Sequence, residues 1–116
     1  YYFSKCLYIM SYDFIKLVKL SGDAKKYKAV LRNKDTGREK SVKFGASGMM
    51  DYTKYYKRDG KKVADEKKAA YRARHSKAGE DWTASGVDTA GFWSLHLLWN
   101  KPSVESSLAE IKRKYF

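Results

Sequence analysis

Basic and aromatic side chains alternate in two stretches of this sequence, residues 52–58 (YTKYYKR) and 67–74 (KKAAYRAR). Lys and Arg neutralise phosphates and tyrosine rings stack on exposed bases, so this mixture is what a sequence-tolerant nucleic-acid surface requires. The pattern also fits a solvated basic face with tyrosines at the margin of the core, selected for solubility or for an acidic protein neighbour. The predicted anion or nucleic-acid contacts are Lys54, Lys57, Arg58, Lys67, Lys68, Arg72, Arg74 and Lys77.

A dense aromatic run occupies residues 89–99 (TAGFWSLHLLW), which are apolar almost all round if helical. Such a helix is either buried or covered by a partner. One interpretation is the main core helix of the domain, packed on a sheet. The other is a partly exposed anchor that seats in a groove of a neighbouring protein, because aromatic anchors dominate interface energies. In the second interpretation the partner interface consists of Phe92, Trp93, His96 and Trp99.

The residues that catalyse reactions in other proteins are few here and lack the usual spacing. His75 lies among cations and His96 inside the apolar run, and neither has an evident partner for acid–base work. Ser47 and Ser94 lie outside the G-x-S-x-G pattern. Cys6 is the single cysteine, so an internal disulfide and the usual four-ligand zinc set are both excluded. We therefore predict a protein that is not an enzyme and has neither metal nor cofactor.

Residues 45–48 (GASG) have the G-x-x-G spacing of a backbone loop that can clamp a phosphate chain. The more specific lysine-bearing P-loop and dinucleotide-binding glycine patterns are absent from the sequence. The simpler interpretation is a flexible turn between a sheet and the helices that follow.

Composition restricts the answer to one small basic domain. The chain has 116 residues and a net charge of +12, and 16% of its residues are aromatic, which disfavours disorder. Residues 54–77 hold ten basic and three acidic side chains, whereas residues 78–116 hold four and five. The partner is therefore anionic: nucleic acid, an anionic membrane surface or an acidic protein.

The start of the sequence is unusual, because Tyr1 is not methionine and the first methionine is Met10. We expect Met10 to be the natural start, residues 1–9 to be a non-native upstream translation or the remnant of a longer chain, and residues 10–116 to form a single domain. The short apolar stretch before Met10 does not fit a secretory signal, and no apolar run is long enough for a membrane span.

Alternating apolar and polar residues predict strands at 14–20, 26–32 and 39–44, with turn residues between them. Helix-favouring residues follow at 62–77 and 103–115, the latter with Ser103 as N-cap, and residues 51–60 read as a loop or short irregular helix. The predicted fold is α+β: a three-stranded antiparallel β-meander, about 13–45, covered by two to three C-terminal α-helices.

Six motifs occur in this order along the sequence: 40–48 (KSVKFGASG), 51–53 (DYT), 71–75 (YRARH), Trp82, 89–94 (TAGFWS) and 97–102 (LLWNKP). Together they resemble a small family of uncharacterised proteins of nucleocytoplasmic large DNA viruses, including chlorella viruses. The match covers roughly residues 13–116, but Leu95-His96 and a longer insert around 59–68 depart from the family pattern. The family has no assigned activity, so the resemblance transfers no catalytic residue.

The resemblance implies a large icosahedral DNA virus as the setting. We therefore predict a non-enzymatic virion structural protein, a minor capsid or cement protein, made in the host cytoplasm and located in the capsid shell or on its inner face. Its partners would be the major capsid protein and other minor capsid proteins, with viral DNA or an anionic membrane surface as further contacts. The alternative is a nucleic-acid-binding accessory protein that acts on viral DNA through the eight basic residues.

Overall fold

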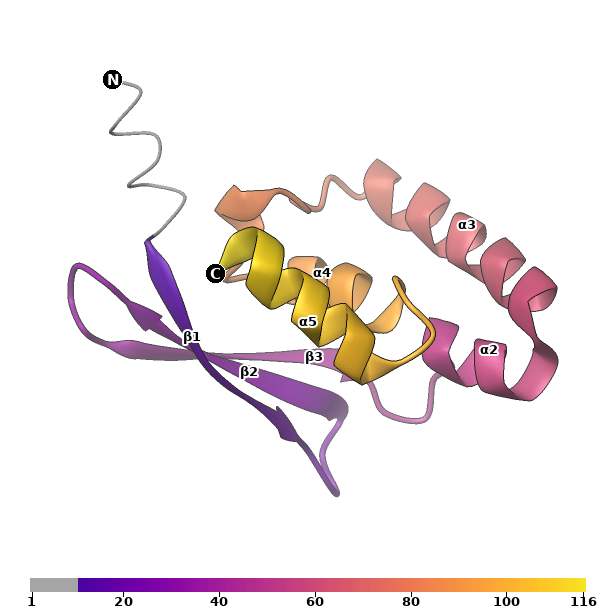
Figure 1. The fold of residues 1–116 in the computed structure, drawn as a ribbon, viewed down its shortest axis with the longest axis horizontal. Helices are drawn as coiled ribbons and strands as arrows, with labels where there is room; N and C mark the ends of the chain where they lie inside the picture. The colour runs from indigo at the N-terminus through magenta and orange to yellow at the C-terminus, as the bar shows by residue number, and fades with distance from the viewer. Residues whose placement is uncertain (1–10) are drawn as a thin grey trace.

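The computed structural model describes residues 11–116, and the predicted extension at 1–9 lies outside the described residues. Three strands form one antiparallel sheet in the order β1-β2-β3, and helices follow in the C-terminal part, so the predicted α+β class is confirmed. Helices α4 and α5 lie over one face of the sheet, while α2 and α3 extend beyond its end (Figure 1). The elements are β1 (Tyr12–Lys19), β2 (Lys25–Asn33), β3 (Glu39–Ala46), α2 (Tyr52–Asp59), α3 (Lys61–Lys77), η1 (Ala84–Gly86), α4 (Ala90–Trp93), η2 (Ser94–Leu98) and α5 (Val104–Tyr115).

A β-bulge in β1 sets which residues of that strand face the core. Phe14 pairs with Leu31, but the register shifts before Lys16, so that Leu17 pairs with Ala29. Without the extra residue, strict alternation from Phe14 would direct Lys16 toward the core. With it, Phe14 and Leu17 both pack against the core and Lys16 is exposed.

The centre of the core is made by the aromatic run rather than by the sheet alone. Phe92 and Trp93 are completely buried, and Trp93 lies against Phe14 and Phe44 with ring centroids 5.8 Å apart in each pair. The Trp93 indole N–H donates to the carbonyl oxygen of Val87 at 2.7 Å, which satisfies its polar atom inside the core. The core-helix interpretation of residues 89–99 is therefore confirmed, although the run is a short α-helix continued by the π-helical segment η2.

The exposed-anchor interpretation of the same run is wrong. Phe92, Trp93 and Trp99 are buried within the chain, where they pack in one core cluster with the apolar residues of the sheet and of α5. His96 is half-buried, and its ring nitrogen Nε2 lies 2.8 Å from the carbonyl oxygen of Trp82. Burial lowers the pKa of His96, so the neutral imidazole is favoured. None of these four side chains forms an open interface patch.

Helix α5 begins as predicted at Ser103, whose hydroxyl accepts a hydrogen bond from the Ser106 backbone N–H at 3.1 Å. Ile111 is buried, and Leu108 packs against the core from the same face. Figure 1 shows α5 crossing in front of α4, which closes the helical layer.

Helix α2 is regular, where the sequence suggested a loop or short irregular helix. Asp51 is its N-cap and accepts from the backbone N–H of Lys54 at 3.2 Å, while Gly60 ends it with a φ of 89° that favours glycine. Helix α3 begins directly after Gly60 and agrees with the predicted helix over 62–77. The chain therefore folds residues 52–77 into a tight helical hairpin.

Candidate nucleic-acid interface

Polar contacts join α2 to α3 and also join this helical hairpin to the sheet. The Tyr52 hydroxyl donates to Asp65 Oδ1 at 2.8 Å and so joins the two helices. Burial, followed by the bond to Asp65, raises the pKa of Tyr52 to about 12, so the donor stays protonated. At the base, the ammonium of Lys26 on β2 lies 2.7 Å from Asp51 Oδ2, and this carboxylate is almost fully buried. The hairpin therefore has a defined position relative to the sheet.

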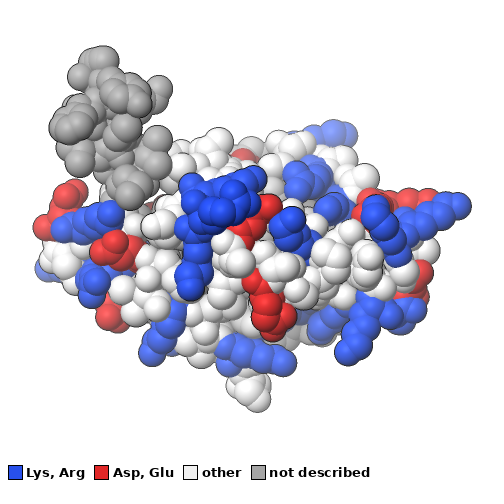
Figure 2. Space-filling view, in the orientation of Figure 1, with Lys and Arg blue, Asp and Glu red and all other residues white. Residues whose placement is uncertain are grey.

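The hairpin exposes a group of cations that no carboxylate neutralises. The group consists of seven Lys and Arg side chains of α2 and α3, all of them exposed. Among residues 11–116, no acidic oxygen lies within 4.0 Å of any of the seven. Figure 2 shows basic side chains over the end of the molecule formed by α2 and α3. A concentration of unpaired charge of one sign attracts polyanions over a distance of about one Debye length. We call this group the hairpin cations: Lys54, Lys57, Lys62, Lys67, Arg72, Arg74 and Lys77.

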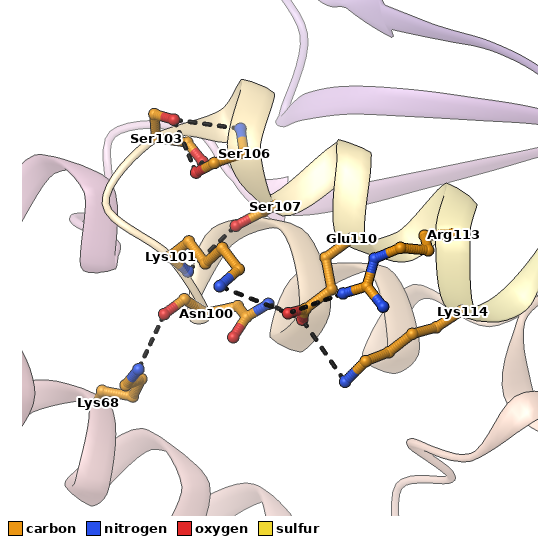
Figure 3. Close-up of polar contacts among 9 residues, drawn as sticks. All are labelled: Lys68, Asn100, Lys101, Ser103, Ser106, Ser107, Glu110, Arg113 and Lys114. Atoms are coloured by element: carbon orange, nitrogen blue, oxygen red, sulfur yellow. Dashed lines mark hydrogen bonds and ion pairs between the residues drawn. The ribbon is translucent and has the colours of Figure 1, made fainter.

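Six of the eight predicted contacts are hairpin cations, and the other two have different surroundings. Arg58 is exposed but lies 2.8 Å from Asp59 Oδ2, so its charge is largely compensated. Lys68 is half-buried and donates to the carbonyl oxygen of Asn100 at 2.8 Å, with its ammonium 4.4 Å from the centre of the Tyr52 ring. Burial and the nearby Arg72 lower the pKa of Lys68. Lys68 therefore joins the hairpin to the loop after η2, as Figure 3 shows.

The tyrosines of the hairpin are not a row of free stacking platforms, which corrects part of the sequence argument. Tyr52 and Tyr71 are buried, and Tyr71 stacks on Trp99 with ring centroids 4.5 Å apart and planes 11° from parallel. Tyr55 remains half-exposed, with Arg58 and Lys67 each 5.5 Å from its ring centre. In a helix, residues three or four positions apart lie on the same face, so a tyrosine between lysines can point toward the core. The alternation of tyrosine and lysine in the sequence therefore does not show that the tyrosines are exposed.

A second basic cluster surrounds Glu110 on α5, and sequence reasoning did not single it out. Glu110 accepts from the Asn100 side-chain amide at 2.7 Å and lies within 4.0 Å of Lys101, Arg113 and Lys114 (Figure 3). The amide hydrogen bond is the largest reason that the pKa of Glu110 is lowered, and Lys114 and Lys101 add to it. One carboxylate thus faces three cations, and the cluster keeps an excess of positive charge. The contacts from Asn100 and Lys101 cross a loop, so no local motif signals them.

The G-x-x-G segment has its exposed groups engaged within the chain. The Ser47 backbone N–H donates to the carbonyl oxygen of Ala24 at 2.9 Å, and the Met49 N–H donates to Ala46 at 3.2 Å. The Ser47 hydroxyl donates to the carbonyl oxygen of Asp23 at 2.6 Å. These bonds support the turn interpretation rather than a phosphate clamp.

No set of three or more His, Cys, Asp and Glu side chains within 11–116 is arranged to hold a metal ion. Over the same residues, no helix combines the length and the apolar character needed to span a bilayer. Comparisons with protein-family models, with curated proteins and with solved structures find no significant match to this chain. The fold and the surface thus define an α+β domain with a basic helical hairpin, and the viral resemblance remains a prediction.

Proposed function

We propose that this protein is a non-enzymatic nucleic-acid-binding protein that contacts phosphates with its α2–α3 hairpin. The observation that carries the proposal is the set of seven hairpin cations, exposed and without an acidic partner among residues 11–116. Each phosphate that such a cation neutralises releases a condensed counterion, which is the main source of sequence-independent affinity.

The hairpin also has the rigidity that a binding surface needs. Its helices are joined through Tyr52 and Asp65, and Lys26 and Lys68 fix it to the sheet and to the loop after η2. The cations therefore need little ordering on binding beyond that of their own side chains, which lowers the entropic cost of association.

A role as a minor capsid or cement protein is a second proposal. The sheet face opposite α4 and α5 has no helical cover in the described part of the chain (Figure 1), so an open face is available to a neighbour. On this proposal the protein resides in the virion, the major capsid protein and other minor capsid proteins are its partners, and the hairpin cations face viral DNA, an anionic membrane or acidic capsid surfaces. The aromatic run no longer supports it, because those side chains are buried.

Fluorescence anisotropy with a labelled DNA duplex, measured over a series of salt concentrations, tests the main proposal. The triple variant Lys57→Gln, Arg72→Gln and Lys77→Gln removes three hairpin cations. Each phosphate contact contributes about 0.9 to the magnitude of the slope of log K against log salt. Loss of three contacts should therefore reduce the magnitude of that slope by about 2.7.

A matched control removes three exposed cations from the sheet side, with Lys16→Gln, Lys19→Gln and Arg38→Gln. Both variants lose the same net charge, so the control should change the slope by less than about 1. Equal slopes in the two variants would show that the net charge, rather than the hairpin, attracts DNA. An absence of binding by the wild type at low salt would remove the proposal altogether.

A further inference from the structure

A pocket of about 360 Å³ lies where the hairpin meets the end of the sheet. Strands β2 and β3 form one side, α2 and α3 form another, and η2 with the following residue forms the floor. A volume of this size is within the range of small-molecule sites, about 300 to 1,000 Å³. The lining residues that matter here are Lys25, Met49, Tyr55, Arg74, Leu98 and Trp99.

The floor and one wall of the pocket are flat and apolar. Trp99 and Leu98 lie at the bottom, and Tyr55 stands beside Trp99 with ring centroids 6.2 Å apart and planes 46° from parallel. Trp99 stacks on Tyr71, which also lines the pocket, so its position is set without a ligand. Rigid aromatic surfaces of this kind bind planar rings by stacking or by edge contacts.

The mouth of the pocket carries an exposed apolar side chain. Met49 is 64% exposed and lines the pocket, and it is the large hydrophobic residue that the described chain leaves most open to solvent. The thioether of methionine packs favourably on the edges and faces of aromatic rings. A planar ring that entered the pocket would cover Met49 and remove its apolar surface from water.

Two cations line the same pocket without an acidic partner. Lys25 and Arg74 are exposed, and no carboxylate oxygen among residues 11–116 lies within 4.0 Å of the Lys25 ammonium or the Arg74 guanidinium. Lys26 is different, because its ammonium contacts both the Asp51 carboxylate and the carbonyl oxygen of Met49. The same ion pair neutralises Asp51, the acidic residue that lines the pocket. The field inside the pocket is therefore positive.

Arg74 connects this pocket to the rest of the hairpin. Lys67 precedes it by seven residues, about two helical turns, so the two side chains leave α3 on the same side. Lys67 lies over the ring of Tyr55, which itself lines the pocket. Lys67 and Arg74 thus lie on the side of α3 that faces Tyr55 and the pocket.

We propose that this pocket receives one nucleotide unit, with the base between Met49, Tyr55 and Trp99 and the phosphate near Lys25 and Arg74. The inference rests on the proposed nucleic-acid binding and makes it more specific, since a pocket that accepts a base requires an unpaired nucleotide. A nucleotide combines a planar base with an anionic phosphate, and these match the aromatic lining and the two cations of the pocket. The nucleotide comes either from a single strand or from free solution.

Nuclear magnetic resonance titration with adenosine 5′-monophosphate, adenosine, inorganic phosphate and a single-stranded oligodeoxyadenylate tests this inference. The indole N–H signal of Trp99 should shift with the monophosphate, while the signals of Trp82 and Trp93, which lie away from the pocket lining, should not. Arg74→Gln should weaken the monophosphate by about tenfold and leave adenosine almost unchanged, because only the phosphate meets the cation. Lys25→Gln provides a second exposed position with the same expectation. Arg38→Gln, which is exposed and lies outside both the pocket lining and the hairpin, is the matched control.

The outcomes separate the pocket from the hairpin. A Trp99 shift with the oligonucleotide that Arg74→Gln weakens supports the pocket with a strand as its source. A shift with the monophosphate but none with the oligonucleotide supports the pocket with a free nucleotide as its source, and the salt dependence of DNA binding then tests the hairpin proposal separately. Salt-dependent DNA binding with no shift of Trp99 under any probe overturns the pocket and leaves the hairpin proposal intact.

Discussion

The ion pair between Lys26 and Asp51 should determine whether the hairpin keeps its position, and Asp51→Asn isolates its contribution. Asparagine is as good an N-cap as aspartate, so the start of α2 remains capped. The change removes the negative charge beside an ammonium whose side chain is only 11% exposed. Loss of one partner from a buried pair costs about 3 to 5 kcal/mol. We expect about 3 kcal/mol, because the Lys26 ammonium keeps its bond to the carbonyl oxygen of Met49.

A double-mutant cycle with Lys26→Met shows whether this cost belongs to the pair. Lys26→Met leaves Asp51 charged, but Asp51 still accepts from Thr53 and from the Lys54 backbone N–H, so about 2 kcal/mol is expected. The double variant should cost about 3 kcal/mol, which is less than the sum of the single changes by about 2 kcal/mol. Urea unfolding followed by circular dichroism measures all three.

Thr53→Ala is the matched control, since it removes one hydrogen bond to Asp51 and leaves the ion pair in place. Its cost should be about 1 kcal/mol. Additive effects of Asp51→Asn and Lys26→Met, within about 0.5 kcal/mol, would refute the argument, because independent residues cannot be coupled through one buried contact.

Two further predictions concern the core. Gly45→Ala should destabilise the fold by about 3 kcal/mol in urea unfolding, because Gly45 has a φ of 77° and an added Cβ would lie 2.7 Å from the Leu98 side chain. Gly22→Ala, with a φ of 68° and no atom near its Cβ, should lose only about 1 kcal/mol, and equal losses would contradict the packing argument. Burial lowers the pKa of His96 in the folded chain, so the unfolded chain binds its proton first and stability should decrease as pH falls below about 6.5. Thermal unfolding between pH 7 and pH 5 should show a smaller loss of stability in His96→Gln than in the wild type. An identical loss in the two proteins would show that other titratable groups dominate.

Local patterns were sufficient to predict the meander and two of the helices. Strand alternation is visible wherever one face is buried, as at Val42 and Phe44, and the cap at Ser103 marks α5 directly. Residues 51–60 were interpreted as a loop or short irregular helix, although α2 has local signals: Asp51 as a cap, Gly60 as an end, and tyrosines at positions 52, 55 and 56 with helical spacing. The π-helical segment η2 depends on packing against α5 and the sheet, which no local signal records.

The candidate site was predicted only in part. Exposed cations such as Lys57 and Arg74 follow from composition and helix propensity. The burial of Lys68 and Tyr71 does not, because it depends on where Asn100 and Trp99 return in space. The pocket itself combines residues from four separated segments, so it exists only at the level of tertiary structure.

The placement of the sheet before its cover has a consequence for synthesis on the ribosome. All three strands are complete by Ala46, whereas Trp93 and Ile111, which bury their apolar face, are made more than forty residues later. At roughly 5 to 20 residues per second, the meander waits several seconds without its cover. During that interval residues 52–77, which form α2 and α3, are already synthesised. Their lysines and arginines give every nascent copy of the chain a positive charge. Mutual repulsion between chains on one messenger would then oppose pairing of their uncovered sheets.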